Sequence, residues 1–304
     1  MRRGIVVLGM HRSGTSALTR VINLSGASLP RHVAPPAGGV AGDGNAEAGF
    51  WESLPLIELH DEALAAGGSS WHDLFDFPRA WFASDQAATF EQRLVEMLRV
   101  EFADDPIFVA KDPRISRLVP LWQGAFGKSS IDPAWVIAVR NPLDVAASLR
   151  ARDGSPMARG LWLWLLYFLA AERDTRDCPR CFVAYDDLLL DWPAVLERLR
   201  RIFGLELAES EANATAISTY LAPSLRHHAS SDSELASRDD VSDSLKQVYA
   251  WASSAARGDE PEFGPLDAAR REVESATAAF RTAPPRWTLT AALAAKQADA
   301  QGAP

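Results

Sequence analysis

The sequence predicts an α/β fold in three layers, with a central parallel β-sheet flanked by helices and a helical C-terminal part. Short apolar, β-branched runs without polar alternation recur in the first two thirds of the chain, which is typical of strands buried on both faces. Segments with apolar residues at helical spacing follow these runs, and strands that alternate with helices form parallel sheets. We therefore expect one domain over residues 1–304, with an α/β core at 1–205 and a helical extension at 206–304.

The first strand, loop and helix are the clearest unit. Residues 5–8 are apolar and β-branched, and the apolar residues of 17–24 recur at helical spacing. The loop between them, Gly-Met-His-Arg-Ser-Gly-Thr-Ser, can converge backbone N–H groups at a helix N-terminus, which is a cradle for phosphate. It departs from the P-loop pattern at Thr15, where that pattern has Lys, and Arg12 is its one cation. The alternative is an ordinary strand–turn–helix corner with an arginine on the surface.

The remaining elements follow in chain order. Residues 25–50 are rich in Gly, Ala and Pro, which predicts a loop. Ser53 is the expected N-cap of the helix after this loop, and Asp85 that of a long helix. We expect strands at 107–110, 135–139 and 182–185, and helices at 53–64, 86–102, 114–122, 142–149, 157–173, 193–203, 213–225, 245–256 and 266–280, with a polar loop at 230–244 and a frayed end at 291–304.

Composition limits the classes of function. The chain has 47% hydrophobic and 23% charged residues and a formal net charge of −9, which argues against a general nucleic-acid binder. Cys178 and Cys181 are the two cysteines, and without further ligands they predict free thiols rather than a zinc site. The longest apolar run, 161–171, is too short for a membrane span, and no signal peptide is evident. We expect a cytoplasmic protein.

Cations follow the predicted strands at the points where the strands end. Arg12, Lys111, Arg114 and Arg140 all lie just past strand carboxyl ends. In open parallel sheets ligands bind outside these ends. Four cations at one edge of an acidic protein are costly unless an anion binds there, so the sequence predicts an anion site at this edge.

These segments together resemble sulfotransferases that use 3′-phosphoadenosine 5′-phosphosulfate (PAPS). The likeness is greatest to bacterial sulfotransferases and to tyrosylprotein or carbohydrate sulfotransferases, and it covers about residues 4–205. It depends on four motifs: His11-Arg12-Ser13-Gly14-Thr15-Ser16, Lys111-Asp112-Pro113, the segment from Arg140 to Ser148, and Tyr185-Asp186-Asp187-Leu188.

The resemblance implies a role for each motif. The loop His11, Arg12, Ser13, Gly14, Thr15 and Ser16 would bind the 5′-phosphosulfate, and Arg140 with Ser148 would bind the 3′-phosphate. Lys111 would approach the sulfuryl group, and Tyr185, Arg114 and Arg226 are further candidates for nucleotide contacts. The product would be adenosine 3′,5′-bisphosphate (PAP). Because sulfuryl carries less charge than phosphoryl, no metal ion is expected, which fits the missing P-loop lysine.

The acceptor hydroxyl would give its proton to a base. The candidates are Glu52, His60 and His11, and Glu52 ranks first because related enzymes place a catalytic glutamate after this loop. Its alternative role is a carboxylate stabilised by a helix N-terminus. The expected catalytic set is Arg12, Glu52, Lys111 and His60.

Three functions stay open at this point. The first is a PAPS-dependent sulfotransferase that acts on a hydroxyl of a carbohydrate or natural product. The second is a P-loop small-molecule kinase, which would need a loop lysine and a Mg²⁺-binding carboxylate. The third is a nucleotide-binding protein without catalysis. A small-molecule or glycan acceptor is the expected partner, with no nucleic acid, no membrane span and the option of a homodimer.

Overall fold

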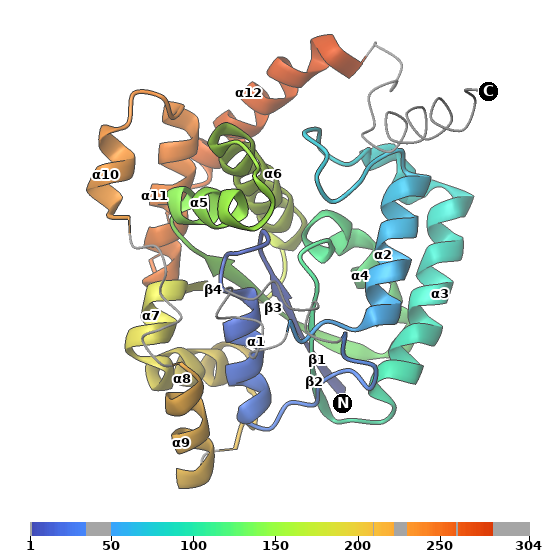
Figure 1. Ribbon diagram of the computed structural model, residues 1–304. Helices are drawn as coiled ribbons and strands as arrows, with labels where there is room; N and C mark the ends of the chain where they lie inside the picture. The colour runs from blue at the N-terminus through green and yellow to red at the C-terminus, as the bar shows by residue number, and fades with distance from the viewer. Residues whose placement is uncertain (1, 35–49, 209, 222–229, 260, 282–304) are drawn as a thin grey trace, which may run out of the picture.

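A four-stranded parallel β-sheet forms the centre of the protein (Figure 1). The computed structural model describes residues 2–34, 50–208, 210–221, 230–259 and 261–281. Its strands β1 (Arg2–Leu8), β2 (Ile107–Lys111), β3 (Ile131–Val139) and β4 (Arg180–Ala184) lie in the order β2-β1-β3-β4. The predicted α/β class with a parallel sheet is confirmed.

The strand order places the topological switch point of the sheet at the carboxyl ends of β1 and β3. The chain leaves β1 for β2 on one side of it and later returns to β3 on the other side. Where connections diverge in this way, a crevice opens outside the strand ends and ligands bind there. The register aligns the ends, because Val7 pairs with Lys111 and Leu8 with Ile137.

Both faces of the sheet are covered, which gives the three layers. Alternate residues of β1 point to opposite faces, so Ile5 and Val7 pack in one apolar cluster and Val6 and Leu8 in another. The first cluster includes residues of α1 (Thr15–Leu24), α8 (Trp192–Phe203) and α9 (Glu211–Tyr220). The second includes residues of α2 (Leu54–Ala66), α3 (Asp85–Phe102), α4 (Ile115–Ser129), α5 (Pro142–Asp153) and α6 (Met157–Thr175). Burial on both sides explains why β1 lacks polar alternation.

Three local expectations need correction. Ser84 caps α3, because its side chain accepts a hydrogen bond from the Ala87 N–H, whereas Asp85 is the first helical residue. Tyr185 does not end β4 but begins the short helix α7 (Tyr185–Leu190). The expected loop at 230–244 contains a helical turn, α10 (Asp232–Ser237), which Ser231 caps by accepting from the Glu234 N–H.

The C-terminal helices α11 (Asp243–Ala256) and α12 (Gly264–Arg281) pack on the core rather than apart from it. Apolar residues of α11 share a cluster with β3 and α6. Buried Glu172 of α6 pairs with Arg176, Arg180 and Arg270, and Arg270 belongs to α12. These ion pairs connect α12 with α6. That residues 1–304 form a single domain stays a prediction.

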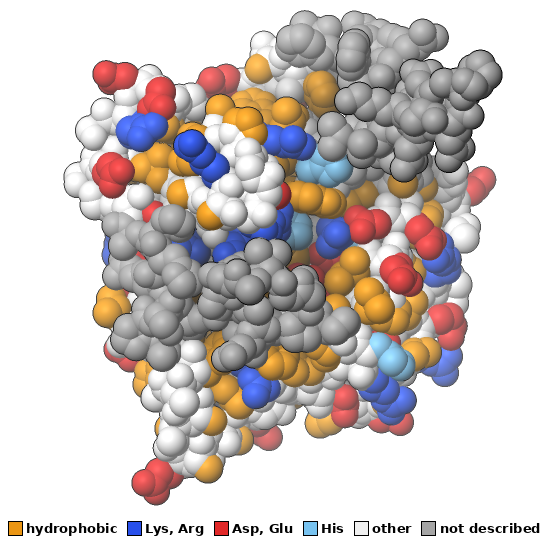
Figure 2. Space-filling model, in the orientation of Figure 1, with side chains coloured by type: hydrophobic (Ala, Val, Ile, Leu, Met, Phe, Trp, Pro, Cys, Tyr) orange, Lys and Arg blue, Asp and Glu red, His pale blue; other side chains and the backbone are white. Residues whose placement is uncertain are grey.

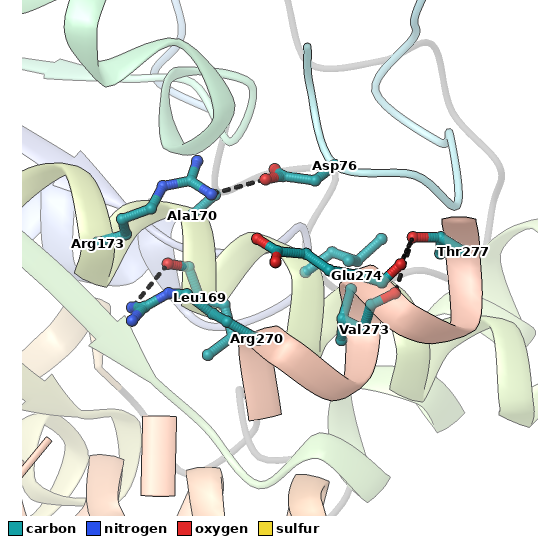
Figure 3. Close-up of a pocket in the computed structure, with 9 residues that line it drawn as sticks. Asp76, Leu169, Ala170, Arg173, Arg270, Val273, Glu274 and Thr277 are labelled. Atoms are coloured by element: carbon teal, nitrogen blue, oxygen red, sulfur yellow. Dashed lines mark hydrogen bonds and ion pairs between the residues drawn. The ribbon is translucent and has the colours of Figure 1, made fainter. Parts of the chain in front are cut away.

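A small pocket lies between α6 and α12, with space of about 20 Å³ for water-sized groups (Figure 3). Arg173 and Asp76 form an ion pair of 2.6 Å at its wall, and Arg270 donates to the Leu169 carbonyl at 3.3 Å. Its size fits about one water molecule, so we assign it to packing.

Candidate functional site

The loop between β1 and α1 is built around two glycines and a left-handed arginine. Gly9 has φ 141°, Arg12 φ 70° and Gly14 φ 84°. The Gly9 N–H donates to Ser116 Oγ at 2.9 Å, and the Ser13 N–H closes a turn on the Met10 carbonyl at 3.1 Å. Left-handed conformations cost a non-glycine residue free energy, so the chain accepts strain at Arg12 to shape this loop.

Gly14 brings the loop against α7. It is the N-cap of α1, and a Cβ at this position would lie 2.2 Å from the Tyr185 ring. Only a glycine therefore allows the loop to contact Tyr185 so closely. The N-terminus of α1 provides unpaired backbone N–H groups here, which favour an anion.

The loop motif and the Arg140 motif meet at Arg12. The Arg12 Nε donates to Ser148 Oγ of α5 at 2.7 Å, and Arg140 Nη1 donates to the Arg12 carbonyl at 2.9 Å. The Arg140 guanidinium also lies over the Tyr185 ring, 4.6 Å from its centre. Four of the residues suggested by the sequence thus form one cluster, Arg12, Arg140, Ser148 and Tyr185.

Polar atoms of this cluster are suited to an anionic ligand. Ser13 Oγ and Arg140 Nε are shielded from solvent and have no hydrogen-bond partner among the described residues. In the described part of the chain, the carboxylate that pairs with Arg140 is Asp144, at 4.0 Å from Nε. A buried donor without a partner costs about 1–3 kcal/mol. Both atoms could recover that free energy by binding phosphate oxygens, so the residues present fit a phosphorylated nucleotide.

Lys111 and Glu52 form a buried ion pair next to the loop. Lys111 Nζ lies 2.6 Å from Glu52 Oε1 and 3.1 Å from Ser16 Oγ. The side chains are 1% and 12% exposed. Burial raises the pKa of the Glu52 carboxyl, although Lys111 opposes this effect. A carboxylate with a raised pKa is a stronger base than an ordinary glutamate.

His60 does not face this site. Its Nδ1 lies 2.8 Å from Asp112 Oδ2, and its Nε2 accepts the Trp122 indole N–H at 3.0 Å. The residue is fully buried, and both ring nitrogens are engaged. With both ring nitrogens engaged, His60 has the geometry of a core histidine, and the catalytic role expected for it stays a prediction.

Arg114 is also committed elsewhere. Its Nε pairs with Asp61 at 2.6 Å and its Nη1 with Asp112 at 3.0 Å. Burial would raise the pKa of Asp112, but the His60 hydrogen bond and the Arg114 charge hold it well below its usual range. Two of the three guanidinium nitrogens are thus paired with carboxylates, and that Arg114 binds the nucleotide stays a prediction.

His11 lies in the loop but faces another side. Its ring stands edge-on to Trp71, with centres 4.8 Å apart, and 6.4 Å from the Tyr167 ring. Its Nε2 is shielded from solvent and has no hydrogen-bond partner in the described part of the chain. Burial, with the nearby charges of Arg114 and Arg152, lowers the pKa of this imidazole well below its usual value. His11 is therefore neutral at physiological pH.

Two residues of the site escaped the sequence reasoning. Asn141 donates to the carbonyls of Ser230 and Ser231, and Asp144 accepts from the Ser230 N–H at 2.9 Å. Both hold the start of a C-terminal segment against α5. Their place in the Arg140 motif was the available signal. Arg226 lies outside the described residues.

The formal net charge of the chain is −9. Figure 2 shows Lys and Arg side chains beside His in the middle of this face, with Asp and Glu side chains next to them and toward the edges. Among the described residues, no group of three or more His, Cys, Asp or Glu side chains is arranged to hold a metal ion. No helix in the same part of the chain combines the length and apolarity needed to cross a membrane.

Comparisons of the sequence and of the fold with known proteins give the following similarities. No protein-family model matches the chain, and no curated protein matches it. The solved structures similar to it include the sulfotransferase domain from the Synechococcus PCC 7002 olefin synthase, with 18% identity and a TM-score of 0.48 over 86% of this chain and 96% of that one. The sulfotransferase domain from the curacin biosynthetic pathway has 14% identity and a TM-score of 0.43, over 91% and 98%.

Proposed function

We propose that this protein is a sulfotransferase that moves the sulfuryl group of PAPS to a hydroxyl of a carbohydrate or natural-product acceptor. The observation that carries the proposal is the joining of two motifs far apart in the sequence. Arg12 of the loop contacts Ser148, and Arg140 contacts the Arg12 backbone, at the sheet edge where α/β folds bind ligands.

The donor nucleotide would be held at both ends. The N-terminus of α1 and the Ser13 hydroxyl are available for the 5′-phosphosulfate. Arg140 and Ser148 are available for the 3′-phosphate, since a guanidinium fork with a hydroxyl suits a dianion. Arg12 precedes Ser13 in the loop and contacts both residues of the 3′-phosphate end, Ser148 and Arg140.

Lys111 and Glu52 would carry the acceptor side of the chemistry. Bound PAPS supplies an activated sulfuryl group for in-line displacement by a hydroxyl. Glu52 would take the hydroxyl proton, and its raised pKa supports that role. Lys111 would hold Glu52 in place and, through its remaining donor, stabilise charge on the transferring group; one such contact is typically worth about 3 kcal/mol.

Transfer of label from [³⁵S]PAPS to a panel of sugars, phenols and alcohols tests the proposal. Glu52→Gln should lower turnover by about 100-fold or more, because it removes the base and keeps the side-chain shape. Glu58→Gln is the matched control, since Glu58 is an exposed carboxylate of the following helix, and it should keep wild-type turnover. Full turnover in Glu52→Gln would remove Glu52 from the mechanism. Transfer of phosphate from Mg-ATP in place of sulfate would identify a kinase instead.

A further inference from the structure

Residues 70–75, here called the clamped segment, lie between α2 and the short helix η1 (Arg79–Ala83). Each of the six carbonyl oxygens accepts a hydrogen bond from a side chain of α4 or α6. The bonds are Arg117 Nη1 to Ser70 (2.7 Å), Tyr167 Oη to Trp71 (2.6 Å), Arg159 Nη2 to His72 (3.2 Å), Arg117 Nη2 to Asp73 (3.2 Å) and to Phe75, and Trp162 Nε1 to Leu74 (2.8 Å).

Such a segment is held in place from outside itself. Irregular segments usually leave their carbonyls to water on the surface. Here a fully buried arginine, Arg117, supplies three of the bonds, and the other donors come from one face of α6. The backbone position of the clamped segment is therefore fixed before any ligand binds, which is what a preformed wall requires.

The clamped segment meets the loop between β1 and α1 where Trp71 contacts His11. The two rings meet edge-on, with an interplanar angle of 63°. Next along the chain, Arg12 instead reaches Ser148 of α5, and its carbonyl holds Arg140 near Tyr185. Two neighbouring residues of the loop thus face different parts of the molecule. His11 lies against the clamped segment, and Arg12 lies against Arg140 and Ser148, the residues proposed to bind the 3′-phosphate.

His11 also lies near Lys111, the ion-pair partner of Glu52. The charges of Lys111, Asp112 and Arg114 act on its ring from the β2 side, and that of Arg152 acts from α5. Burial lowers the pKa of the imidazole, and the positive charges of Arg114, Arg152 and Lys111 lower it further against the opposing charge of Asp112. The ring is therefore neutral, and one of its nitrogens carries a proton and the other a lone pair. Nε2 is shielded from solvent and has no partner among the described residues, a state that costs about 1–3 kcal/mol. A bound hydroxyl would satisfy it.

We propose that His11 binds the acceptor hydroxyl rather than the nucleotide, with Trp71 and the clamped segment as the wall of the acceptor site. This assignment rests on the proposed function. The His11 Nε2–H donates to one lone pair of the hydroxyl oxygen. The other lone pair then forms the bond to sulfur while the bond from sulfur to the 5′-phosphate oxygen breaks, and the hydroxyl proton passes to Glu52. Because the wall is aromatic, the acceptor that fits it has a flat or apolar face beside its hydroxyl.

Histidine NMR tests this assignment with 4-nitrophenol as the acceptor probe. The chain has six histidines, and His11→Gln identifies the His11 signals. Saturating PAP alone should leave the His11 ring signals in place, and 4-nitrophenol added to the PAP complex should shift them. A shift caused by PAP alone would assign His11 to the nucleotide and overturn the proposal. The absence of a shift with 4-nitrophenol would overturn it as well.

Variants separate this inference from the proposed function. His11→Leu and Trp71→Leu should weaken 4-nitrophenol binding to the PAP complex about tenfold, as for one lost contact, and leave PAP affinity within about twofold. His11→Gln should lose less 4-nitrophenol affinity than His11→Leu, because the glutamine amide can donate a hydrogen bond in place of Nε2. His32→Gln, at an exposed histidine, is the control for a histidine change and should behave as wild type. Equal loss of PAP and 4-nitrophenol binding in His11→Leu contradicts the inference, whereas failure of wild type to bind PAP contradicts the proposed function.

Discussion

At the scale of single residues, charge pairing separates the cations that are available to a ligand from those that are neutralised. Arg114 has two carboxylate partners, and Lys111 has one. Arg140 has an aromatic ring on one face and its nearest carboxylate at 4.0 Å. Since all three follow strand ends, position alone does not distinguish them. Their carboxylate partners distinguish them, and Arg140, which has the weakest carboxylate pairing of the three, is best suited to hold a phosphate.

The proposed role of Glu52 as the base predicts how turnover depends on pH. A general base acts only when it is ionised, and burial raises the pKa of this carboxyl above its ordinary 4.5. As pH falls, kcat/KM should therefore begin to drop at a higher pH than an ordinary glutamate would give. A pH–rate profile of wild type and Glu52→Gln measures this. The acid limb should vanish in Glu52→Gln; an unchanged acid limb in that variant would show that another group titrates.

At the scale of elements, the turn from β1 into α1 depends on Gly14. Gly154, which ends α5, has almost the same backbone conformation, with φ 73° and ψ 8° against φ 84° and ψ 9°. A Cβ at Gly14 would meet the Tyr185 ring at 2.2 Å, but a Cβ at Gly154 has nothing within 4 Å. Substituting each glycine with alanine therefore separates the cost of a left-handed alanine from the cost of a clash with Tyr185.

Gly154→Ala should lower the free energy of unfolding by about 1 kcal/mol, the cost of a left-handed alanine. Gly14→Ala should lower it by at least about twice as much and should also weaken PAP binding, because the loop must move away from Tyr185. Chemical denaturation and PAP titration measure both effects. Equal losses of stability in the two variants would show that the contact of Gly14 with Tyr185 carries no weight.

The sequence allowed the elements around the site to be predicted, but not every contact. The buried run in β1 and the spacing of Gly9 and Gly14 predicted the loop, and the parallel sheet then brought Arg140 beside it. The sequence did not reveal that His60 and Arg114 are engaged by Trp122 and Asp61, because these partners come from other helices. Local patterns do not reveal such long-range pairs. Whether Glu52, Lys111 and Arg140 act as proposed stays a prediction.

At the scale of the whole molecule, a buried polar network ties the site to the fold. Asp112 at the end of β2 binds His60 of α2, and Asp112 also pairs with Arg114 just before α4. Trp122 of α4 completes the network through His60. Three elements that flank the site thus share one buried carboxylate, so the network supports the edge of the sheet where Lys111 lies.

Asp112→Asn should lower the free energy of unfolding by about 3 kcal/mol at neutral pH, the usual cost of breaking a buried pair. The lowered pKa of Asp112 means that its contribution is present above the unfolded value of about 3.9 and is lost as pH falls through the folded value. The deficit of the variant in free energy of unfolding should therefore shrink below about pH 4.

Asp61→Asn, which removes the exposed partner of Arg114, should lower the free energy of unfolding by about 1 kcal/mol or less. Denaturation across this pH range measures both, and a pH-independent deficit would contradict the account.

The central claim is that the strand-end site recognises a nucleotide with a 3′-phosphate and needs no metal ion. Calorimetric titration with PAP, 5′-AMP and Mg-ATP tests it, with EDTA present for the first two ligands. Wild type should bind PAP at least about tenfold, or 1.4 kcal/mol, more tightly than 5′-AMP or Mg-ATP.

The variant Arg140→Ala should lose most of the preference for PAP over 5′-AMP, because Arg140 would hold the 3′-phosphate. Arg150→Ala, at an exposed arginine of the same helix region, should keep it. Tighter binding of Mg-ATP than of PAP, or an undiminished preference for PAP in Arg140→Ala, would contradict the claim.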